Sequence, residues 1–259
     1  MQGYIVEQLR QIEQLHQVKV LIAVESGSRS WGWASKDSDY DVRFIYIHPM
    51  EWYLTIETQG MGKKRDVIEL IDNQLDMSGW EITKALRLFR KSNPSILEWM
   101  RSNKIYLQQT GFIFKLRMLE KEVYNPKPVL YHYMQIAKKN ASSLKRENVN
   151  MKSYLHAYRS LFTCKWIKQY QEFPPVHFQQ LIEKVPMDSI VRGELEKLVQ
   201  YKILGERDMM QPNPILNDYI EQELKLLNEA LPFMSTEKKD PTPQLDALFR
   251  STLFEAWGV

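Results

Sequence analysis

Hydrophobic positions repeat every three or four residues over 4–16, and this spacing predicts an amphipathic helix at the start of the chain. Residues 18–24 are β-branched and nearly continuously apolar, which is typical of a short buried strand. A polar stretch that contains glycines follows this strand and leads into a second apolar segment at 42–48, which predicts a second strand.

The same kind of pattern continues to about residue 104. Residues 66–71 and 74–77 favour two further strands or one bent strand. At Ser78 the spacing of apolar residues changes to the helical period, so we expect a helix that Ser78 caps. Beyond Lys104, helix-length segments replace strand patterns; they span residues 110–124, 128–148, 151–170, 187–205 and 213–231. The pattern therefore predicts an α/β domain over residues 1–104, followed by an all-helical domain over residues 105–259.

The composition is that of a soluble globular protein, with 44% hydrophobic and 26% charged residues. The single cysteine, Cys164, excludes an internal disulfide and a zinc site built from several cysteines. A net charge of +3 permits an anionic ligand without identifying one. The longest apolar run, Val18 to Val24, is far shorter than the roughly 20 residues of a transmembrane helix. The first residues also lack the features of a signal peptide, so we expect a cytoplasmic protein with no membrane partner.

Two short motifs bring candidate chemistry to the first domain. Gly27 and Ser28 follow the first predicted strand and precede a predicted short helix, where a glycine allows close backbone approach and free N–H groups suit a phosphate. Asp39 and Asp41 open the second strand, and side chains two positions apart in a strand point to the same side. Two carboxylates on one face favour a divalent cation between them, such as Mg²⁺ or Mn²⁺.

This arrangement resembles a known family. The segment GSRSWGWASKDSDYDVRFIYI (27–47) is similar to the corresponding motif of the DNA polymerase β-like nucleotidyltransferase superfamily, in its YcgL-type branch of bacterial and phage proteins. Further stretches resemble that branch up to about residue 210; they are residues 51–54, 65–70, 75–86, 92–100 and 153–167. The resemblance implies a mixed sheet with flanking helices, followed by a helical domain.

The resemblance also implies roles for individual residues. Gly27 and Ser28 match the pair that contacts the terminal phosphates of a nucleotide, and Asp39 and Asp41 match the metal-binding pair. The superfamily has a third acidic residue on an adjacent strand, which completes the metal site and is a candidate to accept the proton of the attacking hydroxyl. Asp76 is the first candidate for that residue.

Asp66 and Glu69 are the alternatives for the third carboxylate, because the pairing of the strands does not follow from the sequence. Without any ligand, Ser28 would simply cap a helix and Asp39 would begin a turn, since both residue types favour those positions.

Basic residues are candidates to hold the triphosphate. Arg29, Arg43, Lys84 and Arg87 lie near the motifs in the first domain, and Arg159 and Lys202 could close over the phosphates from the helical domain. For Arg43 a structural salt bridge is an equally good interpretation, and for Lys84 and Arg87 a solvated charge on a helix is the more common one.

The sequence thus predicts a Mg²⁺- or Mn²⁺-dependent enzyme that moves a nucleoside monophosphate from a nucleoside triphosphate to a hydroxyl and releases pyrophosphate. The acceptor stays open between an RNA end, a protein and a small molecule; the basic run at 137–148 would suit an RNA backbone but equally a solvated helix end. The alternative is a nucleotide-binding sensor or interaction protein of the same fold that has no transfer activity.

Overall fold

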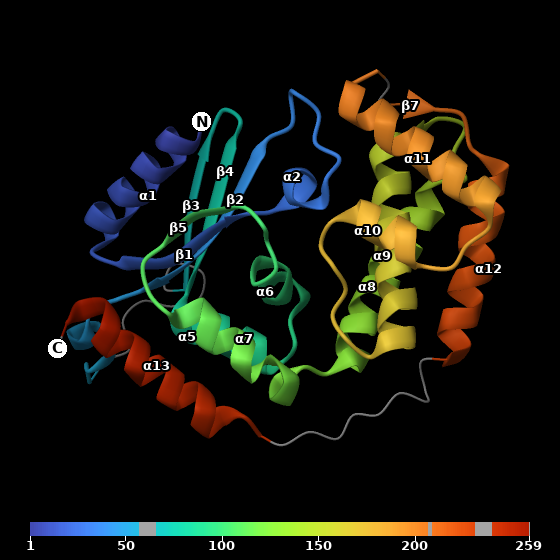
Figure 1. Cartoon of the computed structure of the whole chain (residues 1–259). Coiled ribbons are helices and arrows are strands. Elements are labelled where there is room, and N and C mark those ends of the chain that lie inside the picture. Colours follow the sequence, from blue (N-terminus) through green and yellow to red (C-terminus); the bar gives the residue numbers. More distant parts are fainter. Residues whose placement is uncertain (57–65, 207–208, 231–239, 259) are drawn as a thin grey trace. The chain divides into compact units, whose positions relative to one another are not determined.

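The computed structural model describes residues 1–56, 66–206, 209–230 and 240–258. The chain forms two compact units. The first unit comprises Met1–Ser30, Asp39–Tyr124 and Lys238–Val259, and the second comprises Trp31–Ser38 and Asn125–Glu237. The predicted fold class, a mixed sheet with flanking helices and a helical part, is confirmed by the elements described below (Figure 1).

The first unit is built on a five-stranded mixed sheet with the order β3-β4-β2-β1-β5. Its strands are β1 (Lys19–Glu25), β2 (Tyr40–Ile47), β3 (Val67–Asp72), β4 (Leu75–Glu81) and β5 (Ile105–Gln108). β2 and β4 run parallel, whereas the pairs β1–β2, β1–β5 and β3–β4 are antiparallel. The two central strands β1 and β2 are the most deeply buried, as their continuous apolar sequences predict.

Helix α1 (Gln2–His16) covers one face of this sheet. Its buried residues Ile5, Leu9 and Ile12 share a core with side chains of β1, β2, β4 and β5, which include Val42 and Met77. The predicted N-terminal helix is therefore confirmed. Because side chains alternate along a strand, the odd-numbered positions of β2 face away from α1.

The other helices of the first unit are α3 (Met50–Tyr53), α5 (Ile82–Arg90), α6 (Pro94–Trp99), α7 (Phe112–Val123) and α13 (Thr242–Trp257). The short helix α2 (Gly27–Trp31) begins in the first unit and ends at the first residue of the second. α13 packs against α5 and α7, so the end of the chain returns to the unit that contains its beginning (Figure 1).

The predicted helix cap at Ser78 is wrong. β4 continues through Ser78 to Glu81, because its residues pair with β3 on one side and with β2 on the other. α5 begins only at Ile82, and its N-cap is Glu81, whose carboxylate accepts hydrogen bonds from the backbone N–H groups of Thr83 and Lys84. The short alternating end of β4 and the first turn of α5 have similar apolar spacing, so periodicity alone did not separate them.

The compact units also differ from the predicted division at residue 104. Strand β5 begins at Ile105 and hydrogen-bonds to β1, and α7 contacts β1 as well as α13. These contacts join residues 105–124 to the sheet. The loop from Trp31 to Ser38 is grouped instead with the helical unit.

Helix α9 (Met151–Tyr170) lies at the centre of the second unit, and it buries side chains on all sides, as expected for a central helix. Around it lie α8 (Pro126–Ser143), α10 (Phe178–Lys184), α11 (Ser189–Leu204) and α12 (Pro214–Ala230). Two-residue strands β6 (Val149–Asn150) and β7 (Met209–Met210) pair beside them. The predicted helical segments at 128–148, 151–170, 187–205 and 213–231 correspond to α8, α9, α11 and α12.

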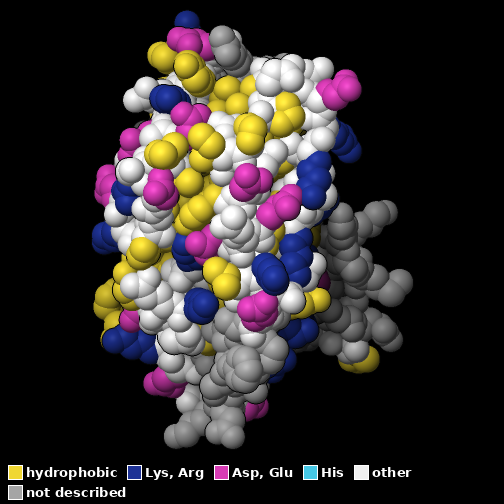
Figure 2. All heavy atoms as spheres, turned by 90° about the vertical axis from the view of Figure 1, so that its right-hand side faces the viewer, with side chains coloured by type: hydrophobic (Ala, Val, Ile, Leu, Met, Phe, Trp, Pro, Cys, Tyr) yellow, Lys and Arg dark blue, Asp and Glu magenta, His cyan; other side chains and the backbone are white. Residues whose placement is uncertain are grey.

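The face of the molecule drawn in Figure 2 does not identify a partner by itself. On the face drawn in Figure 2, Lys and Arg side chains are interspersed with Asp, Glu and hydrophobic side chains. Among the residues that the structure describes, no helix combines the length and the apolar character needed to cross a bilayer.

Candidate active site

Asp41 and Asp76 lie side by side in the sheet. In the parallel pairing of β2 with β4, Asp41 is the register partner of Asp76, so both side chains point to the same face. That face is opposite to the one covered by α1, because the flanking Val42 and Met77 belong to the α1 core. The structure therefore places the first candidate for the third carboxylate directly beside Asp41.

The two alternative carboxylates lie elsewhere along the sheet. Glu69 is exposed and pairs with Ser78, two residues further along β4 than Asp76. Asp66 precedes β3 at the end that pairs with Trp80, and its carboxylate is 4.0 Å from the guanidinium of Arg87. Of the three candidates, only Asp76 is in register with Asp41.

The guanidinium of Arg43 bridges the two aligned carboxylates. Its Nη2 lies 3.2 Å from Asp41 Oδ1 and 3.1 Å from Asp76 Oδ2, and its Nη1 lies 3.2 Å from Asp76 Oδ1. Nη1 also donates to the backbone carbonyls of Val42 and Asp76, at 3.1 and 2.9 Å. The structural salt bridge considered for this residue is thus present, and it is bidentate toward Asp76.

Asp41 sits in an environment that disfavours its charge. Burial raises the pKa of the Asp41 carboxyl above its usual value, and the negative charges of Asp76 and Asp39 raise it further, against the opposing effect of Arg43. Asp39 itself is exposed just before β2. Asp39 and Asp76 thus both act electrostatically on the Asp41 carboxyl.

The Gly27–Ser28 turn is held against Asp41. Gly27 has a φ of +58°, and a Cβ atom at this position would lie 1.9 Å from Asp41 Oδ2. The N–H of Ser26 donates to the backbone carbonyl of Asp41 at 2.7 Å, which fixes the approach of the two segments. Position 27 therefore requires glycine for two reasons, the left-handed backbone and the nearby carboxylate.

Glu25 is a buried carboxylate that sequence reasoning missed. It is 1% exposed at the end of β1, and its Oε1 accepts a hydrogen bond from the N–H of Asp41 at 3.1 Å, while Tyr106 donates its hydroxyl to Oε2. Burial raises the pKa of Glu25, although the hydrogen bond from Tyr106 and the charge of Lys104 oppose this shift. The available signal was an acidic residue that ends an apolar strand immediately before the Gly-Ser turn.

Two cations lie over an aromatic ring next to this turn. The guanidinium of Arg29 stacks over Tyr40, 3.7 Å from the ring centroid, and the ammonium of Lys104 lies 5.6 Å from the same centroid. Arg29 Nε also donates to the backbone carbonyl of Asp39 at 3.1 Å. The structure thus brings Arg29 to the carboxylates, and it adds Lys104, which the sequence did not single out.

Lys84 is not brought to the carboxylates. It lies in the first turn of α5, which follows the last residue of β4, whereas Asp76 lies at the start of that strand. Its ammonium is 5.9 Å from the Trp80 ring centroid. Glu81 lies five residues further along β4 than Asp76, which amounts to about 17 Å of strand. The predicted contact of Lys84 with the triphosphate is therefore not supported by this arrangement.

Arg159 and Lys202 belong to the second unit. Both are nearly buried, with 6% and 7% exposure. The guanidinium of Arg159 lies 4.3 Å from the ring centroid of Trp31, in a cluster where Trp31 and Trp33 both contact the edge or face of His156. Their predicted role in closing over phosphates stays a prediction.

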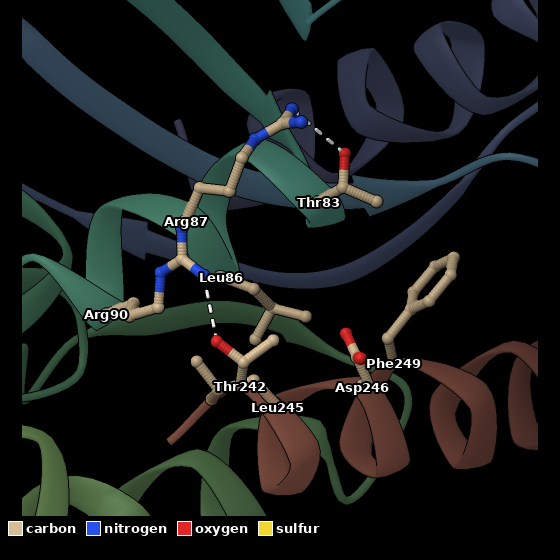
Figure 3. Close-up of a pocket in the computed structure, with 8 residues that line it drawn as sticks. All are labelled: Thr83, Leu86, Arg87, Arg90, Thr242, Leu245, Asp246 and Phe249. Atoms are coloured by element: carbon tan, nitrogen blue, oxygen red, sulfur yellow. Dashed lines mark hydrogen bonds between the residues drawn. The ribbon is translucent and has the colours of Figure 1, made fainter. Parts of the chain in front are cut away.

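A separate pocket of about 270 Å³ lies between α5 and α13 (Figure 3). Arg87 and Arg90 line it from α5, and each donates to a threonine hydroxyl, Thr83 and Thr242 respectively. Asp246 and Phe249 line it from α13. Arg87, a candidate to hold the triphosphate, is among the residues that line this pocket, whereas Asp39, Asp41 and Asp76 are not.

The donor set around Asp41 fits a hard divalent cation. Aspartate oxygens are the ligands that Mg²⁺ and Mn²⁺ prefer, and the aligned pair already holds a positive group between its oxygens. In the part of the chain that the structure describes, no three His, Cys, Asp or Glu side chains are gathered closely enough to hold a metal as they stand. Arg43 lies between Asp41 and Asp76 instead.

A Gly-Ser turn held against in-register aspartates on a mixed sheet is the arrangement of a polymerase β-like nucleotidyltransferase. The chain belongs to this class: residues 1–251 match the model of the RNA repair pathway DNA polymerase beta family. The chain is also 40% identical over 260 aligned residues to the uncharacterized protein YcgL of Bacillus subtilis (strain 168), which covers 99% of this chain and 98% of that protein. The expected family is thereby confirmed.

A weaker likeness links the chain to a nucleotidyltransferase-like protein from Exiguobacterium sibiricum 255-15, whose crystal structure is known. The match has a TM-score of 0.31 and 15% identity, and it covers 88% of this chain and 74% of that one. The family assignment does not rest on it.

Proposed function

We propose that the protein transfers a nucleoside monophosphate from a nucleoside triphosphate to a hydroxyl at an RNA end and releases pyrophosphate, with Mg²⁺ or Mn²⁺ as cofactor. The observation that carries this proposal is the register of β2 with β4, which aligns Asp41 with Asp76 beside the Gly27–Ser28 turn. The choice of RNA among the open acceptors is supported by the description of the family as part of an RNA repair pathway.

In this reaction the acceptor oxygen forms a bond to the α-phosphorus, and the bond from that phosphorus to the bridging oxygen of the β-phosphate breaks. Divalent cations would be held by Asp39, Asp41 and Asp76, and they would stabilise the charge on the entering and leaving oxygens. The proton of the attacking hydroxyl would pass to the carboxylate of Asp76, which is 44% exposed and thus accessible to an acceptor.

The remaining groups of the site bind and orient the substrate. Gly27 allows the turn to lie against the Asp41 carboxylate, and the hydroxyl of Ser28 donates to the terminal phosphates. Arg29 supplies positive charge next to this turn, and its guanidinium is kept in place by the Tyr40 ring and the carbonyl of Asp39. Glu25 fixes the backbone at Asp41 through its hydrogen bond to that N–H group.

The test is a transfer assay with each of the four α-³²P-labelled nucleoside triphosphates, Mg²⁺ or Mn²⁺, and a short RNA. The RNA is offered with an intact 3′ end and, in parallel, after periodate oxidation of that end. D39N and D41N are the active-site variants, and D37N is the matched control because Asp37 is an exposed aspartate of the same loop.

We expect label on the intact RNA together with pyrophosphate release, at least about a hundredfold slower in D39N and D41N and unchanged in D37N. Transfer to the intact but not the oxidised RNA would place the acceptor hydroxyl at the 3′ end. Metal-dependent nucleotide binding without pyrophosphate release, with every RNA tested, would refute transfer and favour a nucleotide sensor.

A further inference from the structure

Arg43 occupies the position between the acidic side chains that a metal ion would need. Three carboxylate oxygens of Asp41 and Asp76 lie 3.1 to 3.2 Å from its two terminal nitrogens. The same Nη1 is anchored by the backbone carbonyls of Val42 and Asp76. The guanidinium is therefore fixed in one orientation by both side chains and backbone.

A divalent cation and this guanidinium exclude each other. Mg²⁺ requires oxygen ligands at about 2.0 to 2.1 Å in near-octahedral geometry, and three of the four carboxylate oxygens of Asp41 and Asp76 now face Arg43. Two positive groups at the same carboxylates also repel each other, and the repulsion is large at such short range because the site is partly shielded from water. The side chain of Arg43 is 20% exposed and that of Asp41 is 28% exposed.

Removing Arg43 without adding a metal would leave Asp41 and Asp76 adjacent and unneutralised. The arginine thus allows the two carboxylates to lie side by side in the metal-free protein. Its hydrogen bonds to them are the contacts that a bound metal would have to replace.

We propose, on the basis of the function proposed above, that Arg43 is a built-in counter-ion that is displaced when the metal binds. In the metal-free protein it neutralises the aligned pair Asp41 and Asp76, and it thereby lowers the apparent affinity of the site for divalent cations. Arg43 is a positioning residue in this account, because it acts through the two carboxylates. Once displaced, its positive charge lies on the strand face where the triphosphate is expected.

The test is the binding of Mn²⁺ to the full-length protein, measured from the electron paramagnetic resonance signal of the free ion, without nucleotide or RNA. Wild type is compared with R43Q, which removes the charge, and with R43K, which keeps the charge but cannot form the bidentate contact. R90Q is the matched control, because Arg90 is an arginine of the same unit whose hydrogen bond goes to the Thr242 hydroxyl.

We expect R43Q to bind Mn²⁺ at least about tenfold more tightly than wild type, R43K to lie between them and R90Q to equal wild type. Without metal, R43Q should unfold at lower urea concentration than wild type, and saturating Mn²⁺ should close that gap. In wild type, Mg²⁺ should shift the Nε–Hε resonance of Arg43 in ¹H–¹⁵N spectra.

Two failures can be told apart. If wild type binds Mn²⁺ but R43Q binds it equally or more weakly, Arg43 does not compete with the metal, and this inference falls while the proposed function stands. If neither wild type nor any variant binds Mn²⁺ at millimolar concentration, both the metal-dependent function and this inference fall. Should R43Q not fold, R43K decides the question, since equal or weaker binding by that variant also overturns the competition.

Discussion

Gly27 lies against the carboxylate of Asp41, which makes G27A an informative substitution. An alanine Cβ would lie 1.9 Å from Asp41 Oδ2, whereas ordinary contacts begin at 3.4 Å, so the carboxylate would have to withdraw by about 1.5 Å. The alanine backbone would also be held at a φ of +58°, which costs about 1–2 kcal/mol for an L-residue.

We expect G27A to lose about 1–3 kcal/mol of unfolding free energy and to lose transfer activity by about a hundredfold or more. The loss of transfer follows because a displacement of about 1 Å at a reacting centre is enough to slow a reaction to that extent. Urea unfolding followed by circular dichroism measures the first quantity, and the labelled-nucleotide assay measures the second.

G205A separates the backbone effect from the contact with Asp41. Gly205 has a φ of +71° at the end of α11, but a Cβ there would have no atom within 4 Å. This variant should lose about 1 kcal/mol and keep its transfer activity. If G27A loses no more stability than G205A and transfers nucleotide at a rate within about threefold of wild type, the close approach to Asp41 does not constrain position 27.

Three further substitutions test the packing around the site and in the helical unit. Y106F should cost about 1.5–3 kcal/mol in urea unfolding, because the buried carboxylate of Glu25 loses its hydroxyl donor. G79A should cost about 1–3 kcal/mol in the same assay, since its Cβ would lie 2.1 Å from the Phe44 ring. The unfolding free energy of wild type should fall by about 3 kcal/mol between about pH 6.5 and pH 4, whereas that of H156F should not show this fall; urea unfolding at several pH values measures both.

The sign of the last prediction follows from the cause of the shift. Burial, and then the charges of Arg159 and Lys152, lower the pKa of His156 from 6.5 to about 4 in the folded protein. Between these values the unfolded chain binds a proton that the folded protein does not, so unfolding becomes easier as the pH falls. H16Q, which alters an exposed histidine at the end of α1, is the control and should keep the wild-type slope. Equal slopes in wild type and H156F would refute the assignment.

The local part of the site could be predicted because it is encoded within a short stretch of chain. Gly27 and Ser28 lie on α2 and Asp41 lies on β2, the next strand along the chain; Asp39 comes just before β2, so strand alternation does not determine its side. The central helix α9 could also be predicted, because its bounds at 151–170 depend on its own sequence. Strand β5 and helix α13 were not recognised as parts of the first unit, since only their contacts with β1, α5 and α7 assign them there.

The electrostatic part of the site depends on pairings between distant segments. Asp76 reaches Asp41 because the β3–β4 hairpin returns the chain parallel to β2, with a register that periodicity does not determine. The salt bridges of Arg43 follow from that same register. A shift of β4 by one residue would turn Asp76 to the α1 face and leave Arg43 with Asp41 alone. The charge balance of the site is therefore a property of the sheet pairing, and the effect of R43Q on Mn²⁺ affinity tests that pairing together with the chemistry.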